Sequence, residues 1–148
     1  MENIIRFSAI VLLASCLLAG AFSCSTKKDI RPQLDRAVAR FHERYNAGQM
    51  NEIYELSSNG FKASHTKDDF TLKLSFMRMK VGEVESTKRI FGGDDLTWKP
   101  TDMHPAALYN TKGTKGDFSE HFTWDISGDE AILDDYYTKE GHEDLNAR

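Results

Sequence analysis

The chain has 148 residues, of which 28% are charged and 40% hydrophobic, and its formal net charge is −4. A chain of this length suffices for one domain with one hydrophobic core. The composition excludes a collagen-like or wholly disordered chain, a membrane protein with several spanning helices, and a basic nucleic-acid-binding protein. The sequence therefore predicts a single polar domain that does not bind nucleic acid.

Residues 1–23 have the pattern of an export signal. Only Glu2 and Arg6 are charged before Lys27, and residues 7–22 carry no charge. Crossing a bilayer takes about 20 apolar residues, so this run is short for a stable spanning anchor. Its length and the small residues at its end are typical of a cleaved secretory signal. The alternatives are an uncleaved signal anchor and a free periplasmic protein.

Both cysteines of the chain, Cys16 and Cys24, lie at this end, which excludes a disulfide within the domain. Gly20-Ala21-Phe22-Ser23-Cys24 resembles the lipobox of bacterial lipoproteins, where a signal peptidase cuts before a cysteine that carries diacylglycerol. Leu13-Ala14-Ser15-Cys16 resembles a lipobox as well, but cleavage there would leave an apolar N-terminus. Cys24 instead begins a polar tether, residues 24–29. The resemblance thus implies lipidation at Cys24, with Cys16 as the alternative.

Three helices are predicted after the tether. Asp29 is a candidate N-cap, with Pro32 in the first turn. An apolar stripe then recurs every three or four residues until Gly48 ends the helix. The stripe consists of Ile30, Leu34, Val38, Phe41 and Tyr45. A short second helix is predicted from about Asn51, and the turn residues 57–60 close it.

The segment 66–81 fits both a strand and a helix. Alternating apolar residues favour a strand: Phe70, Leu72, Leu74 and Phe76. A helical stripe is also present: Phe70, Leu74, Met77 and Val81. Thr66 and Asp69 have the spacing of a capping box, and Gly82 would end a helix. The cap and the length of the segment favour the helix.

From Glu83 onward the pattern predicts strands separated by glycine-rich turns. The predicted strands are residues 84–91, 106–111, 117–126 and 130–138, and residues 96–105 are a loop or a short strand. Helices followed by antiparallel strands predict an α+β domain over residues 30–139, in which the helices cover one face of a curled sheet of about four strands. Residues 140–148 are predicted to be a polar, disordered tail.

Two stretches resemble small bacterial lipoproteins of unknown function. One begins Phe41-His42-Glu43-Arg44-Tyr45 and the other Thr66-Lys67-Asp68-Asp69-Phe70. Those proteins are similar to the cystatin-like, cone-shaped fold of nuclear transport factor two, ketosteroid isomerase and SnoaL-like domains. The resemblance covers residues 33–138 and consists of helix ends and core positions. It therefore implies a fold rather than an activity.

A pocket between helix and sheet is usual in that fold, and Glu120 is the first candidate to line it. It shares a strand face with Phe118, Phe122 and Trp124. A carboxyl group among aromatic side chains can serve as a general acid or base. The position of Glu120 near a hairpin instead predicts contact with water, and this is the favoured interpretation.

No other constellation predicts catalysis, a metal or a cofactor. Asp134 and Asp135 are adjacent, so one should face solvent while the other is free to line a pocket. The histidines are scattered and lack the spacing of zinc ligands: His42, His65, His104, His121 and His142. The sequence His142-Glu143-Asp144 fits a solvated tail better than a metal site.

Charge is distributed unevenly along the chain. Residues 24–93 have a net charge of +4, whereas residues 94–148 have a net charge of −8. Arg36, Arg40 and Arg44 recur every four residues on the first predicted helix. These arginines either attract anionic lipid near the anchor or form a solvated helix face that balances an acidic sheet. The second interpretation is favoured.

Together these patterns predict a lipid-anchored protein of the bacterial cell envelope, held at the periplasmic side of the outer membrane if the host has one. Its domain is expected to be non-catalytic and to bind a protein or small-molecule partner, with homodimerisation as a further possibility. The alternative is a pocket enzyme of the ketosteroid isomerase or polyketide cyclase type.

Overall fold

The computed structural model describes residues 29–91 and 104–142. Four helices come first in the chain: α1 (Arg31–Asn46), α2 (Met50–Glu55), α3 (Asn59–Ser64) and α4 (Lys67–Val81). Four strands follow: β1 (Val84–Phe91), β2 (Ala106–Gly113), β3 (Asp117–Ser127) and β4 (Glu130–Glu140). The predicted α+β class is confirmed, and most of the uncertain segment 96–105 lies outside the described residues.

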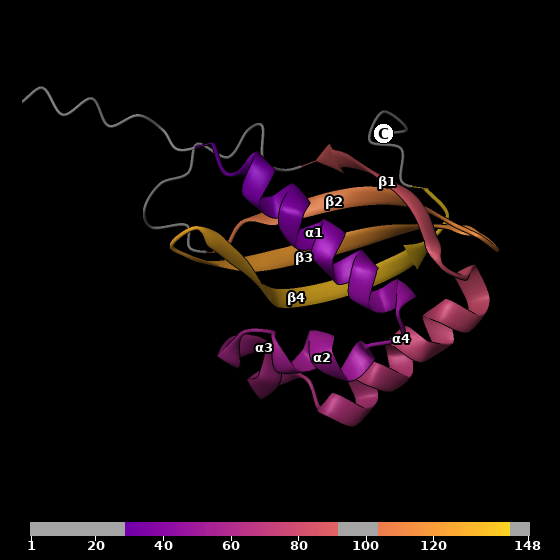
Figure 1. Cartoon of the computed structure of the whole chain (residues 1–148), viewed down its shortest axis with the longest axis horizontal. Helices are drawn as coiled ribbons and strands as arrows, with labels where there is room; N and C mark the ends of the chain where they lie inside the picture. Colours follow the sequence, from indigo (N-terminus) through magenta and orange to yellow (C-terminus); the bar gives the residue numbers. More distant parts are fainter. Residues whose placement is uncertain (1–28, 92–103, 143–148) are drawn as a thin grey trace, which may run out of the picture.

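The strands form one antiparallel sheet in the order β1-β2-β3-β4 (Figure 1). The sheet is curled but not closed, because β1 and β4 are its two edges. Helix α1 crosses one face of the sheet, and α2, α3 and α4 gather beyond the β4 edge (Figure 1). Helices therefore cover one face of the curled sheet, as the chain order predicts.

The boundaries of α1 follow from local sequence. Pro32 lies in the first turn, where a missing N–H costs no hydrogen bond. Asp29 lies one residue before the N-cap position, which Ile30 occupies, so the predicted N-cap is wrong by one residue. Asp29 still accepts a hydrogen bond from the Arg31 amide at 3.0 Å. Gly48 ends the helix with φ +75°, a conformation that favours glycine.

Helix α3 is a correction to the predicted turn at 57–60. The Ser58 hydroxyl accepts a hydrogen bond from the Phe61 amide at 2.9 Å, so the serine caps a helix. The Ser58 amide donates to the Leu133 carbonyl at 2.8 Å, which fixes this end of the helix against β4. The chain therefore has four helices among its described residues, rather than the three predicted.

Helix α4 resolves the ambiguous segment in favour of a helix. Thr66 accepts a hydrogen bond from the Asp69 amide at 3.2 Å, as in a capping box, and Gly82 follows the last turn. Phe70 and Leu74 are buried on the inner face. Leu72 and Phe76, the other two residues of the alternating set, are exposed on the outer face. The alternation therefore reflects two apolar faces of one helix.

The space between the helices and the sheet is filled by aromatic side chains. Phe122 of β3 is fully buried and lies 5.1 Å from Phe41 of α1 and 5.0 Å from Tyr136 of β4, measured between ring centroids. Trp124 stacks on Phe122 at 5.2 Å. Such contacts add to the hydrophobic stabilisation of a core. The concave face of the sheet is therefore a packed core around these rings.

Candidate functional site

Glu120 lies at the centre of the sheet, on the face that α1 covers. Its side chain is 0% exposed, so the prediction that it contacts water is wrong. The β2–β3 register places Glu120 opposite Tyr109, and the β3–β4 register places it opposite Thr138. Thr111 and Tyr136 are then its diagonal neighbours on the same face of the sheet.

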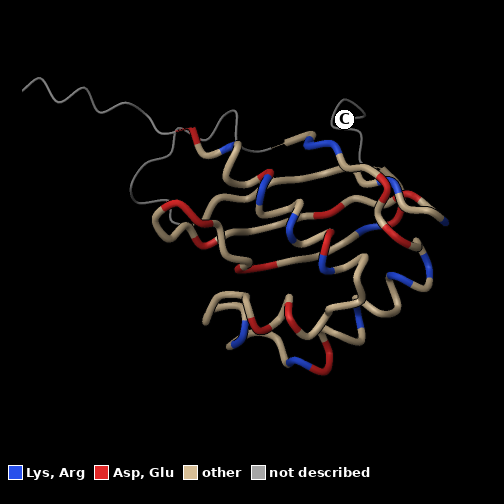
Figure 2. Tube along the Cα trace, in the orientation of Figure 1, with Lys and Arg blue, Asp and Glu red and all other residues tan. Residues whose placement is uncertain are grey.

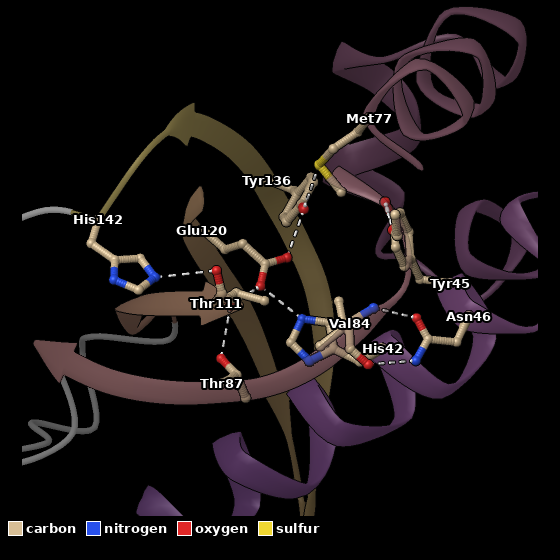
Figure 3. A network of polar contacts seen from close by, with 11 residues as sticks. His42, Tyr45, Asn46, Met77, Val84, Thr87, Thr111, Glu120, Tyr136 and His142 are labelled. Carbon is tan, nitrogen blue, oxygen red and sulfur yellow. Dashed lines mark hydrogen bonds and ion pairs between the residues drawn. The ribbon is translucent and has the colours of Figure 1, made fainter. Parts of the chain in front are cut away.

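Three side chains hydrogen-bond the Glu120 carboxyl group (Figure 3). The Thr111 hydroxyl donates to Oε2 at 2.5 Å, and His42 Nε2 donates to the same oxygen at 2.7 Å. The Tyr136 hydroxyl donates to Oε1 at 2.8 Å. A buried carboxylate requires such partners, because an unpaired charge in the core is very costly. We call these four residues the Glu120 cluster.

The Glu120 cluster extends to other elements. Thr87 of β1 hydrogen-bonds the Thr111 hydroxyl at 2.9 Å. The Tyr136 hydroxyl lies 3.6 Å from the Met77 sulfur of α4. His42 belongs to α1, so the cluster connects two helices and all four strands (Figure 3). This connectivity indicates that the cluster orients α1 and α4 on the sheet.

Burial also sets the ionisation of the tyrosines. Burial raises the pKa of Tyr136 well above its ordinary value, and the charge of Glu120 and the hydrogen bond to it act in the same direction. Tyr45 is buried beside α4, where burial and the Glu120 charge raise its pKa, while Arg78 opposes the shift. Both phenols therefore stay protonated and act as hydrogen-bond donors.

The Glu120 cluster combines a carboxyl group, an imidazole and a phenol, which are side chains that can act as general acids or bases in enzymes. A substrate must reach them, however, and both carboxyl oxygens contact protein donors inside a packed core. Glu120 also lines none of three surface grooves formed by the described residues. The arrangement is therefore that of a structural polar cluster.

The paired aspartates lie apart from the Glu120 cluster. The register of β3 and β4 shifts beside Trp124, so Asp134 bulges out of the ladder. Asp134 accepts a hydrogen bond from the Ser58 hydroxyl at 2.5 Å and thus supports the start of α3. Asp135 is exposed and lies 3.2 Å from His65. One aspartate faces solvent, as predicted, and the other contacts a helix cap.

The histidines are dispersed over several elements. His42 is the buried one and belongs to the Glu120 cluster. His121 stacks on Tyr137 at 4.0 Å, and His104 lies 3.0 Å from Asp134. His142 contacts the Thr111 carbonyl at 3.3 Å. Within residues 29–91 and 104–142, no three metal-ligating side chains gather into one site.

The outer face of α4 is a second unusual feature. Leu72, Phe76 and Met79 are 55%, 58% and 63% exposed, although all three are large and apolar. Their spacing of four and three residues places them on one face of the helix. We call this the α4 outer face. Singly exposed apolar residues are ordinary, but three together form a patch of the kind that binds other molecules.

The sequence contains signals for both features. His42 interrupts the apolar face of α1 next to Phe41, and Glu120 interrupts an apolar strand face. Charged residue types are almost never buried unless they are paired, so two such interruptions predict a pair. The helix favoured over 66–81 likewise leaves Leu72 and Phe76 off its apolar stripe, which predicts a second apolar face.

The predicted lipidation site and the alternative Cys16 lie outside the described residues, as does the export signal. Among the described helices, none is both long and apolar enough to cross a membrane. Comparison with protein-family models, with curated proteins and with solved structures finds no match to this chain. The resemblance to bacterial lipoproteins and to the cystatin-like fold therefore stays a prediction.

Proposed function

We propose that this chain is a lipid-anchored protein of the bacterial cell envelope whose domain is non-catalytic and binds a protein partner through the α4 outer face. The observation that carries the proposal is the exposure of Leu72, Phe76 and Met79 on one side of a single helix. Covering a large apolar side chain that is half exposed is worth about 1 kcal/mol or more. Three of them supply a substantial part of the energy of a docking interface.

Charge around the patch indicates which partner fits. Helix α4 contains four basic residues and two acidic ones. The basic residues are Lys67, Lys73, Arg78 and Lys80. In Figure 2, Lys and Arg also recur along α1, whereas acidic residues are frequent on the sheet. Lys67, Arg78 and Lys80 already pair with acidic residues of the domain, which leaves the charge of Lys73. A complementary partner presents an apolar surface with an acidic side chain that can face Lys73.

The alternative function is a pocket enzyme of the ketosteroid isomerase or polyketide cyclase type. Glu120, His42 and Tyr136 are the residues that would perform its acid–base steps. The complete burial of Glu120 argues against it, since a general base must come within hydrogen-bond reach of a substrate proton. The docking function needs no opening of the core and is preferred for that reason.

The proposed anchor places the domain close to a membrane. The five residues 25–29 between Cys24 and the domain span at most about 17 Å when extended. Two or more acyl chains hold a protein stably to a membrane, whereas one gives marginal binding. Ser25, at the position after the lipidated cysteine, resembles lipoproteins that are sorted to an outer membrane. The α4 outer face would then meet partners in the periplasm or in the same membrane.

The anchor is tested by changing each cysteine separately. With Cys24→Ser we expect a soluble or unprocessed protein, because no lipid can be attached. With Cys16→Ser we expect the mature protein to be unchanged, which makes this variant the matched control. Mass spectrometry of the mature N-terminus is the measurement. An unmodified N-terminus, or lipid on Cys16, would refute the proposed anchor.

Docking is tested in intact cells by placing a photoreactive phenylalanine analogue at Phe76. Phe91 is the matched control, because it is also phenylalanine, is 56% exposed and lies on β1 instead of α4. We expect a discrete crosslinked species from position 76 that is absent at position 91. Leu72→Lys should abolish it, since a charge at the patch opposes apolar docking.

The mass of the crosslinked species decides the identity of the partner. A second protein rich in acidic residues near the crosslink supports the proposal. A species of twice the mass of the chain would show instead that the α4 outer face is a homodimer interface. Equal crosslinking from positions 76 and 91, or none from either, would refute docking at α4.

A further inference from the structure

A groove of about 440 Å³ runs between α1, α2, β3 and the start of β4, and Glu120 does not line it. Its floor is apolar and consists of buried side chains from four elements: Phe41, Ile53, Trp124 and Leu133. Arg40 and Arg44 of α1 line it as well. The volume lies within the range of small-molecule sites, and an apolar floor with a few polar groups is their usual composition.

The two arginines differ in their contacts. Arg44 Nε donates to Glu52 at 3.1 Å and Nη1 donates to the Arg40 carbonyl, so its charge is already paired. The Arg40 side chain is exposed and makes no hydrogen bond or ion pair with any other described residue. Glu130 lines the groove too and is exposed. The groove therefore offers one unpaired guanidinium group, which favours one anionic group.

Trp124, one of the floor residues, carries a buried donor without a partner in the described part of the chain. Trp124 is 2% exposed, and its indole Nε1 is buried with no acceptor among residues 29–91 and 104–142. Buried N–H groups in native proteins are nearly always hydrogen-bonded, so an orphan one requires an explanation. An indole N–H can only donate. Arg40 and the Trp124 indole are thus unmatched donors, whereas Glu130 contributes one exposed acceptor at the rim. The two donors fit a ligand that carries an acceptor.

We propose that this groove binds a monocarboxylate amphiphile, a molecule of the fatty-acid class with one anionic head and an apolar chain. The carboxylate pairs with the Arg40 guanidinium, whose fork of N–H groups matches the two carboxylate oxygens. The chain lies on the floor formed by Phe41, Ile53 and Leu133 and excludes water from it. The site is separate from the α4 outer face, so this inference does not depend on the proposed docking function.

The probe is decanoate, added to the purified protein and followed by NMR and calorimetry. The indole N–H signal of Trp124 is the site-specific readout, and Trp98→Phe identifies it because the chain has two tryptophans. We expect saturable binding of decanoate that moves this signal. Decanol, with the same chain but no charge, and acetate, with the charge but no chain, should each bind at least tenfold more weakly.

Matched variants locate the head group. Arg40→Gln should weaken decanoate binding at least tenfold and leave decanol unaffected. Arg36→Gln removes the same charge one turn earlier on α1, outside the groove, and should change binding less than twofold. Leu56→Ser shortens an exposed side chain of the groove wall and should weaken decanoate and decanol equally.

Several outcomes would overturn the inference. Equal losses in Arg40→Gln and Arg36→Gln would show attraction to the general positive charge of α1. Equal affinity for decanoate and decanol would show an apolar site without head-group recognition. A Trp124 signal that does not move at saturation would place the ligand elsewhere. Phe76→Ser should leave decanoate binding unchanged, and this separates failure of the groove from failure of docking at α4.

Discussion

Replacing Glu120 by leucine tests whether the Glu120 cluster stabilises the fold. The change keeps a side chain of similar size but leaves His42, Thr111 and Tyr136 without their common acceptor. A buried donor without a partner costs about 1–3 kcal/mol, and more when it is charged. Thr111 still has Thr87 as a partner, at 2.9 Å, so its cost is at the low end.

With three donors left unpaired, the loss is at least about 3 kcal/mol. We expect Glu120→Leu to lower the free energy of unfolding by about 3–5 kcal/mol, the range found when one member of a buried pair is removed. A domain of this size has a total stability of about 5–15 kcal/mol, so the loss is a large fraction of it. Glu120→Gln keeps one acceptor oxygen for the neighbouring donors. It should therefore cost about 1–2 kcal/mol.

Urea unfolding followed by circular dichroism measures these differences. Glu85→Leu is the matched control, because Glu85 is an exposed strand residue paired with Lys112 at 3.0 Å. An exposed ion pair contributes about 0–1 kcal/mol, so this variant should be nearly as stable as the unchanged protein. Tyr136→Phe with Glu120→Gln completes a double-mutant cycle, which remains measurable if Glu120→Leu does not fold.

If Glu120→Leu were as stable as Glu85→Leu, the reasoning would be refuted. Such a result would mean that the donors find other acceptors or water at no cost, and that the core around Glu120 is open to solvent. It would also revive the pocket enzyme, since an accessible carboxyl group is what that function lacks.

Three further predictions follow from the same core and from α4. Burial raises the pKa of three tyrosines above the ordinary value of 10: Tyr45, Tyr109 and Tyr136. The unfolded chain therefore loses these protons first, and the free energy of unfolding should fall as the pH rises above 10, by about 1.4 kcal/mol per pH unit for each tyrosine. Phenolate absorbance measured during alkaline unfolding checks this prediction, and ionisation before unfolding would contradict it. Phe76→Ser should change stability by less than about 0.5 kcal/mol in urea unfolding, as is usual for exposed sites, whereas buried Leu74→Ser should cost at least about 3 kcal/mol. Gly82→Ala should lower the free energy of unfolding by about 2–3 kcal/mol, because φ +81° with ψ −152° is open essentially to glycine alone. Gly128→Ala is the control: with φ +62° and open space around it, this change should cost about 1 kcal/mol.

The sequence predicts most of the fold because the relevant signals are local. Gly48 and Gly82 end α1 and α4 at the predicted residues, and alternation followed by glycine-rich turns locates all four strands. Helix α3 was missed because asparagine and glycine at its start are poor helix formers and are typical of turns. The cap by the Ser58 hydroxyl and the contact of the Ser58 amide with Leu133 of β4 hold this turn as the start of a helix.

The Glu120 cluster is harder to predict because its members are distant in sequence. His42 and Glu120 are 78 positions apart, and their contact depends on where α1 crosses the sheet. The position of Glu120 near a strand end predicts exposure, because strand ends commonly meet solvent. In the structure His42 of α1 contacts Glu120, and Met77 of α4 contacts the neighbouring Tyr136, so a residue near a turn is fully buried. Burial there is a tertiary property that strand periodicity does not report.

The ambiguity over residues 66–81 has a physical meaning beyond secondary structure. A helix that packs on one side needs apolar residues on that side alone, and Phe70 and Leu74 already supply the inner contacts of α4. Leu72, Phe76 and Met79 are more than half exposed, so they bury too little surface to contribute much to the domain, and in water they favour aggregation. Residues that cost solubility without stabilising the fold are explained by a contact outside it. The pattern that mimics a strand is therefore that of a helix with two apolar faces, of which the domain covers one and the proposed partner would cover the other.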